Sequence, residues 1–488
     1  MEKYMGNKSK LLDFIYSNVE KELRPDDERS LFDAFTGTTN VGKYFKKNGY
    51  DVAVNDINDF SYVLGKCYVD CKKVPKFKKL INSKTYFSDN YNKICGTKSF
   101  DDNMNKLIRE NKNTVNNDYM KDNKDSNYFK IINYLTYYST PADYDNLEDK
   151  NPIDSINFLQ KNYCEFGENT KYINLVYKKT LDSVVKDLEK KNNNKAIDYI
   201  YTFYEYPFDI KYLNKALECI DKKSEGYKKI MYVLGKNNIV GSRKFFSIEH
   251  AKRIDTILNT ILFWNKMDLL EGNEFYVLMT SVIETITIFS NTSATYQAFY
   301  KDYRANTLQP FRLVIPEIIE GDGRYNVLQG DICNVINNVN SNILYLDPPY
   351  NWRQYDSNYH LLNTVAKLSK INIRDFEKNI VGASGENRVE KLQYTSFNKS
   401  ATFEKQLFDI IKKSKSKIIV LSYSDSESNH KVKEIDQTLK MITDFMKNDD
   451  IFVKGSFKMI KYNRKNFESR KDNKKLNINE LLFIVRKK

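Results

Sequence analysis

Hydrophobic residues occur in two kinds of pattern along the chain. Near the N-terminus, two short apolar runs, LFDAF (31–35) and DVAVNDI (51–57), flank the loop TGTTNVG and the helical segment KYFKKNG. Short apolar runs bounded by Gly and Asn are typical of buried strands. The segment NKSKLLDFIYSNVEKEL (7–23) instead has apolar residues at helical spacing. This order of strand, loop, helix and strand predicts a parallel α/β architecture.

Further apolar runs in the C-terminal part of the chain predict the remaining strands. They cover residues 325–332, 342–347, 417–423, 451–460 and 479–485. Residues 247–303 have apolar positions at helical spacing, whereas residues 66–240 are rich in Lys, Asn, Asp and Tyr and have only short helical patterns. We therefore expect one sheet whose first part precedes residue 60 and whose remainder follows residue 324. The region 66–240 is expected to be a separate insertion.

Composition adds a basic charge to this picture. The 488 residues include 78 Lys and Arg against 64 Asp and Glu, a formal net charge of +14. Such a balance favours a polyanionic partner, although a solvated basic surface explains it equally well. The six cysteines lack the paired spacing of a zinc site, and the sequence has no run of about 18 apolar residues. We therefore expect a cytoplasmic, soluble protein without a metal site.

The motif LDPPYN follows the apolar run NILYL and offers candidate catalytic groups. Asp347 and the carbonyl of Pro348 can each accept a hydrogen bond from an exocyclic amine, while Pro348 and Pro349 remove N–H donors from the pocket. Tyr350 offers a flat face on which a base can stack. The amine of adenine is a poor nucleophile because its lone pair is delocalised into the ring, so methylation requires such acceptors. A proline-rich turn with a chance aspartate is the alternative interpretation.

A second group of residues is arranged as in nucleotide-binding sites. Gly37 permits close approach of a ligand to the backbone, and Asp56 ends the next predicted strand, where it can bind ribose hydroxyls. Asp331 ends another predicted strand and can reach the adenine ring of a bound nucleoside cofactor. An ordinary strand-to-helix turn at Gly37 and an Asx turn at Asp331 are the alternatives. Because a ribose-binding site and an amine-binding motif are expected on the same sheet, each strengthens the functional interpretation of the other.

Together these motifs resemble the amino-group DNA methyltransferases of the adenine-specific DPPY class, in the alpha order of motifs. KYMGNKSKLLDFI (3–15) resembles the family's N-terminal cofactor motif, DAFTG its glycine motif and LDPPYN its catalytic motif. The resemblance covers about residues 1–65 and 243–488. It implies catalytic roles for Asp347, Pro348, Pro349 and Tyr350. It also implies an S-adenosylmethionine site that is built from Tyr4, Lys8, Asp33, Phe35, Thr36, Gly37, Asp56, Ile57, Asp331, Ile332 and Asp347.

The resemblance further implies a fold and a function. The expected fold is α/β, a Rossmann-like S-adenosylmethionine-dependent methyltransferase sheet with a largely helical inserted target-recognition region. Residues 1–65 then hold cofactor motifs, 66–240 the inserted region, and 241–488 a helical segment and the catalytic motif. The expected reaction is site-specific methyl transfer to the N6 amine of adenine in double-stranded DNA by base flipping, in restriction-modification or phage protection. A cognate restriction endonuclease is a candidate partner, and association with the nucleoid is expected.

Two departures from the family pattern leave alternatives open. The glycine loop reads TGTT where the family often has more glycine, and the region 66–240 has no recognised counterpart, so an inert insertion is the alternative to target recognition. Methyl transfer to the N4 amine of cytosine, or to RNA, uses related chemistry. A catalytically dead DNA-binding module with a methylase fold, or a nuclease fused within 66–240, belongs to a different class. The intact sequence from Asp347 to Tyr350 argues against a dead site.

Overall fold

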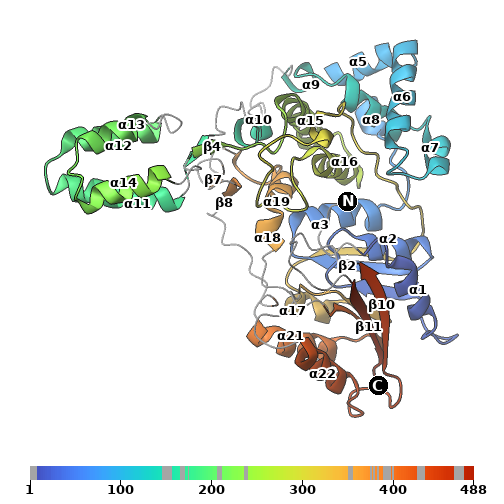
Figure 1. The fold of residues 1–488 in the computed structure, drawn as a ribbon. Helices are drawn as coiled ribbons and strands as arrows, with labels where there is room; N and C mark the ends of the chain where they lie inside the picture. Colours follow the sequence, from blue (N-terminus) through green and yellow to red (C-terminus); the bar gives the residue numbers. More distant parts are fainter. Residues whose placement is uncertain are drawn as a thin grey trace.

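A central mixed sheet of seven strands organises the protein in the computed structural model (Figure 1). In spatial order its strands are β10 (Lys458–Lys465), β11 (Asn477–Arg486), β9 (Ile418–Ser424), β6 (Ile343–Leu346), β1 (Ser30–Asp33), β2 (Asp51–Asp56) and β5 (Tyr325–Gln329). The strands β1, β2, β5, β6 and β9 are parallel, whereas β11 is antiparallel to both β9 and β10. All residues of β1, β6 and β9 are buried, which explains why apolar residues predominate in their sequences.

The sheet is split in sequence as predicted, because β1 and β2 precede residue 60 and its other strands follow residue 324. The prediction of a strand over 451–460 is wrong for its first part, since β10 begins only at Lys458. Gly455 has a φ of +76° in a turn that interrupts the extended chain. The structure describes residues 8–145, 157–164, 171–173, 175–205, 211–235, 240–349, 355–373, 376, 380–381, 384–387, 397, 400–425, 435–465 and 477–488.

Helices cover both faces of the sheet, and the strands supply alternating side chains to two cores. The covering elements are α1 (Leu12–Glu20), α2 (Asn40–Lys47), α17 (Ile332–Val335), η3 (Ile336–Asn338), α21 (Ser400–Lys413) and α22 (Ile435–Met446). The first two pack on one face, and the others pack on the opposite face (Figure 1). In β6, for example, Tyr345 belongs to the first core, whereas Leu344 and Leu346 belong to the second.

A large helical layer packs beside the sheet (Figure 1). Its elements are α3 (Asp59–Gly65), the π-helix η1 (Lys66–Asp70), α4 (Lys78–Ile81), α5 (Tyr86–Ile94), α6 (Lys98–Asn111), α7 (Asn117–Asn123), α8 (Asn127–Tyr137), α9 (Ala142–Asp145), α10 (Phe158–Asn162), α15 (Ile248–Lys266), α16 (Glu274–Phe289), η2 (Ala305–Leu308), α18 (Tyr355–Asn358) and α19 (His360–Lys367). Segments from 60–164 and from 245–376 share one hydrophobic core, in which Trp264 packs against Phe87 with ring centroids 4.6 Å apart. Residues that are distant in sequence therefore form one packing unit.

A helical unit with its own core extends from this body (Figure 1, left). Its helices are α11 (Leu175–Glu189), α12 (Asn194–Glu205), α13 (Lys211–Glu218) and α14 (Glu225–Gly235). At its base, β3 (Lys171–Ile173) and β4 (Val240–Ser242) pair antiparallel, so the chain enters and leaves the unit at one place. A short hairpin of β7 (Ile380–Val381) and β8 (Glu386–Asn387) completes the described strands. None of the described helices is both long and apolar enough to cross a lipid bilayer.

Candidate active site

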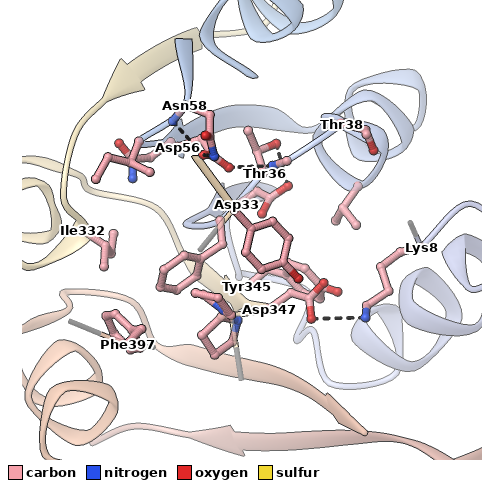
Figure 2. Close-up of a pocket in the computed structure, with 18 of the residues that line it drawn as sticks. Lys8, Asp33, Thr36, Thr38, Asp56, Asn58, Ile332, Tyr345, Asp347 and Phe397 are labelled. Atoms are coloured by element: carbon pink, nitrogen blue, oxygen red, sulfur yellow. Dashed lines mark hydrogen bonds and ion pairs between the residues drawn. The ribbon is translucent and has the colours of Figure 1, made fainter. Parts of the chain in front are cut away.

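A pocket lies at the carboxyl ends of β1, β2, β5 and β6, where open α/β sheets bind their ligands (Figure 2). It contains about 930 Å³ of space, part of which is open solvent. The pocket is lined by Lys8, Asp33, Phe35, Thr36, Gly37, Thr38, Asn40, Val41, Asn55, Asp56, Ile57, Asn58, Gly330, Asp331, Ile332, Tyr345, Asp347, Pro348, Pro349, Tyr355 and Phe397. Loops that follow four different strands therefore converge on one cavity.

Asp33 is the last residue of β1, and only 1% of it is exposed. Its Oδ2 accepts a hydrogen bond of 2.9 Å from the hydroxyl of Thr36, whereas its Oδ1 meets no hydrogen-bond donor within the described part of the chain. Burial raises the pKa of Asp33 to about 7; the bond from Thr36 lowers it in part, and the charges of Asp347 and Asp56 raise it. A buried oxygen without a donor is suited to a ligand that donates a hydrogen bond.

Asp56 ends β2 and fixes the glycine loop. Its Oδ2 accepts the backbone N–H of Gly37 at 2.8 Å, and Gly37 has a φ of +51°, a conformation that favours glycine. Its Oδ1 accepts both the backbone N–H and the side-chain amide of Asn58 at 2.9 Å (Figure 2). Burial raises the pKa of Asp56, and these N–H donors partly offset that rise. The carboxylate is held in place and lines the pocket.

Asp347 follows β6 and pairs with a buried lysine (Figure 2). The Nζ of Lys8 lies 3.1 Å from Oδ1 of Asp347 and 3.6 Å from Oε2 of Glu480, which comes from β11. Burial alone would lower the pKa of Lys8, but attraction by the two carboxylates raises it well above its ordinary value. Lys8 is therefore charged at neutral pH and holds Asp347 at the pocket.

The opposite part of the pocket is apolar and lies near α17. Phe35 and Phe397 meet edge to face with ring centroids 5.2 Å apart, and Ile332 lines the pocket beside them. The predicted strand over 325–332 ends at Gln329, since Asp331 caps α17 by accepting the backbone N–H of Cys333 at 2.9 Å. The Asx turn expected at Asp331 is thus present, and Asp331 also lines the pocket.

The pocket brings together most of the residues that the sequence predicts for the site. Those described are Lys8, Asp33, Phe35, Thr36, Gly37, Asp56, Ile57, Asp331, Ile332, Asp347, Pro348 and Pro349. Tyr4 and Tyr350 lie outside the described residues. Asn55 was not among the predicted residues. Its side-chain amide donates to the carbonyls of Ala34 and Gly330 at 3.2 and 3.1 Å and so joins the neighbouring loops. Its place in NDIN, beside Asp56, was the available signal.

Sequence analysis also missed Tyr345, Phe397 and Glu480. Tyr345 lies in the apolar run of β6, where nothing distinguishes it from a core residue. Glu480 is a buried acid in an otherwise apolar strand, a pattern that could have been noticed. Phe397 reaches the pocket from a distant part of the chain, and the sequence has no signal for this placement.

The charges of the site favour a cationic ligand. Asp33, Asp56, Asp331 and Asp347 line the pocket, and among the lining residues that the structure describes only Lys8 carries a positive charge. An apolar surface beside buried acceptors suits a ligand with a flat ring, hydroxyl groups and a positive charge. Within the described part of the chain, no three His, Cys, Asp or Glu side chains cluster as a metal site requires.

Comparison with known proteins identifies DNA methyltransferases as relatives of this chain. Residues 4–216 and 168–438 match the profile of the D12 class N6 adenine-specific DNA methyltransferases. The chain is 28% identical to the modification methylase StsI of Streptococcus sanguinis over 55% of this chain and 38% of that protein. It is 33% identical to the type II methyltransferase M.NlaIII of Neisseria lactamica over 36% of this chain and 55% of that protein.

A third relative, the type II methyltransferase M.FokI of Planomicrobium okeanokoites, is 39% identical over 25% of this chain and 19% of its own length. The matched part thus spans at most 55% of the length of any of these three curated relatives. No solved structure gives a significant match. Because the profile covers most of the sequence and the pocket holds the family's motifs, the chain belongs to the D12 class of N6 adenine-specific DNA methyltransferases.

Proposed function

We propose that this chain transfers a methyl group from S-adenosylmethionine to the N6 amine of adenine in double-stranded DNA. One observation carries the proposal: Asp347 of the catalytic motif lines the same pocket as Asp33 and Asp56, which are suited to hold the cofactor. Direct transfer needs the methyl donor and the acceptor side by side in one cavity. Family membership supports this reaction class.

The pocket suits S-adenosylmethionine in three places. The buried Oδ1 of Asp33 can accept a hydrogen bond from the methionine ammonium, and Oδ2 of Asp56 has a second lone pair for a ribose hydroxyl. The rings of Phe35 and Phe397, with Ile332, offer an apolar surface for the adenine ring. When bound, the sulfonium supplies an activated methyl group and a neutral thioether leaving group. The surrounding carboxylates favour its positive charge.

The target adenine is proposed to bind beside Asp347 after it flips out of the duplex. Asp347 and the carbonyl of Pro348 accept the two hydrogens of the amine, so the nitrogen lone pair turns out of the ring plane toward the methyl group. The ion pair with Lys8 holds the carboxylate of Asp347 in place. Tyr350, outside the described residues, is the proposed stacking partner of the base. The transfer is direct and forms no covalent intermediate with the protein: the N–C bond forms as the S–C bond breaks, and the methylated nitrogen gives up one proton, by way of Asp347, to solvent.

The same proposal assigns the larger parts of the chain. The order of the strands, with an antiparallel β11 between β9 and β10, supports a Rossmann-like S-adenosylmethionine-dependent methyltransferase sheet. We assign residues 1–65 and 241–488 to the methyltransferase domain and target recognition to 66–240, supported by the projecting unit of α11–α14. Double-stranded DNA is the proposed partner in the nucleoid, with a cognate restriction endonuclease in the same system.

Direct sequencing of native DNA from cells that express the protein tests this function. We expect N6-methyladenine at one short recognition sequence and none in cells that carry the empty vector. N4-methylcytosine at a fixed sequence would contradict the assignment of the base. Unmodified DNA, combined with failure of the purified protein to bind S-adenosylmethionine, would contradict the reaction itself.

A further inference from the structure

A chain of partly buried hydrogen bonds connects the cofactor side of the pocket to α18. We propose that Asn363 is a positioning residue that couples cofactor binding at Asp56 to capture of the target base. The proposal rests on the proposed function, because that function places the cofactor at Asp56 and the target base beside Asp347, in the pocket that Tyr355 also lines. The coupling itself follows from contacts that do not involve the reacting atoms.

The first link joins Asp56 to Asn58. The backbone N–H and the side-chain amide of Asn58 both donate to Oδ1 of Asp56 at 2.9 Å, and Asn58 is only 4% exposed. Asn58 occupies the residue before α3 but does not cap that helix with its side chain. An asparagine in this place ordinarily caps its own helix. Here its amide group is directed to Asp56 on one side and to Asn363 on the other.

The second link is the side chain of Asn363, from α19, which is 3% exposed. Its Nδ2 donates to Oδ1 of Asn58 at 3.0 Å and to Oδ1 of Asp356 at 2.9 Å. Its Oδ1 accepts the backbone N–H of Phe60 at 3.3 Å and so supplies the cap that α3 otherwise lacks. Both amide hydrogens and the oxygen are used. The reverse orientation of the amide would place its oxygen against two other oxygens, so only one orientation is compatible with these partners.

The third link reaches α18. Asp356 lies in that helix, and its neighbour Tyr355 lines the same pocket as Asp347. Because buried hydrogen-bonding groups are costly to leave unpaired, the linked groups favour a single common arrangement. A ligand that holds Asp56 in this arrangement therefore also favours one position of α18. In this way occupation of the cofactor side stabilises α18, and occupation of the base side favours the cofactor in return.

The test measures this coupling as a ratio of dissociation constants. S-adenosylhomocysteine, which has no methyl group to transfer, is titrated into the full-length protein alone and into its complex with an unmethylated DNA duplex. This duplex contains the recognition sequence found by sequencing. We expect the wild-type protein to bind it more tightly in the complex. In Asn363→Ala this ratio should fall toward one, by roughly fivefold or more. Asp356→Ala breaks the last link at a less buried residue and should have the same effect.

Asn133→Ala is the matched control. Asn133 is a fully buried asparagine of α8 whose amide donates to the carbonyl of Phe100 at 3.1 Å, away from the pocket. This variant should keep the wild-type ratio even if it lowers the melting temperature. A wild-type ratio of dissociation constants in Asn363→Ala would overturn the coupling. If Asn363→Ala does not fold, the same ratio in Asp356→Ala decides. In either case, methylation by the wild-type protein would leave the proposed function intact. Absence of methylation by the wild-type protein would overturn both.

Discussion

Asp33 stands at the end of β1 with its carboxyl group buried in the pocket. Burial, opposed in part by the hydrogen bond from Thr36 and assisted by the charges of Asp347 and Asp56, raises its pKa to about 7. The methionine ammonium of the proposed cofactor needs the ionised form. Cofactor binding should therefore release a proton at acidic pH, and affinity should fall by roughly tenfold for each pH unit below about 7.

Calorimetric titration of S-adenosylmethionine across a pH series checks this prediction. Asp33→Asn is the control, because it retains an acceptor for Thr36 but cannot ionise. It should bind the cofactor weakly and show a much flatter pH dependence than the wild-type protein. An equally steep decline in Asp33→Asn would show that another group is responsible.

Lys8 sits between two carboxylates that come from distant parts of the chain. Replacing Lys8 by Met leaves Asp347 and Glu480 close together without the lysine's charge, and we expect a loss of about 3–5 kcal/mol in the free energy of unfolding. Urea denaturation at neutral pH measures this loss. The double variant Lys8→Met with Glu480→Gln should be more stable than Lys8→Met alone, because one uncompensated charge is removed. Strictly additive effects would contradict the three-residue cluster.

At the scale of elements, Gly42 marks the closest approach of α2 to β2. A Cβ on Gly42 would lie 2.7 Å from Cγ1 of Val54, so in Gly42→Ala either the buried Val54 side chain or α2 must shift. We expect a loss of about 1–3 kcal/mol in stability and weaker cofactor binding, since α2 follows the glycine loop. Thermal unfolding with and without S-adenosylmethionine measures both effects.

Gly226→Ala in α14 is the comparison for that variant. There the added Cβ would lie 3.4 Å from Cγ1 of Val184, an ordinary contact, and alanine favours the helix. This change should raise stability by up to about 1 kcal/mol and leave cofactor binding unchanged. Equal effects of the two substitutions would show that α2 is not tightly packed.

The elements also show what the sequence can predict. Strands and the loops that follow them are encoded locally, so β1, β2 and the positions of Asp56 and Asp347 could be anticipated from apolar runs and their polar ends. Contacts between residues that are distant in sequence could not be anticipated in this way. Asn363 meets Asn58 across 305 residues, and Glu480 reaches Lys8 from a C-terminal strand, although neither residue lies in a local motif of the site. The predicted start of β10 at residue 451 was wrong because of a local feature, the turn at Gly455.

At the scale of the whole molecule, the separate core of α11–α14 makes its role testable by removal. The ends of the unit lie side by side, since Ile173 pairs with Val240, so a short glycine-rich turn can replace residues 174–239. We expect this variant to bind S-adenosylmethionine as the wild-type protein does, because the pocket is built elsewhere. It should lose methylation at the recognition sequence.

DNA binding by this variant supplies a second measurement. The chain has a net charge of +14, and each lost phosphate contact should reduce the slope of log K against log salt concentration by roughly 0.9. A shallower slope is therefore expected after the deletion. Unchanged site-specific methylation and an unchanged slope would identify the unit as an inert insertion.

Transfer of labelled methyl groups from S-adenosylmethionine to duplex DNA by the wild-type protein and by Asp347→Ala decides whether Asp347 activates an adenine amine for methylation. After digestion of the DNA to nucleosides, we expect the label in N6-methyl-2′-deoxyadenosine for the wild-type protein. We expect no label for Asp347→Ala, although that variant still binds duplex DNA. Wild-type transfer by Asp347→Ala, or label in cytosine, would contradict the account.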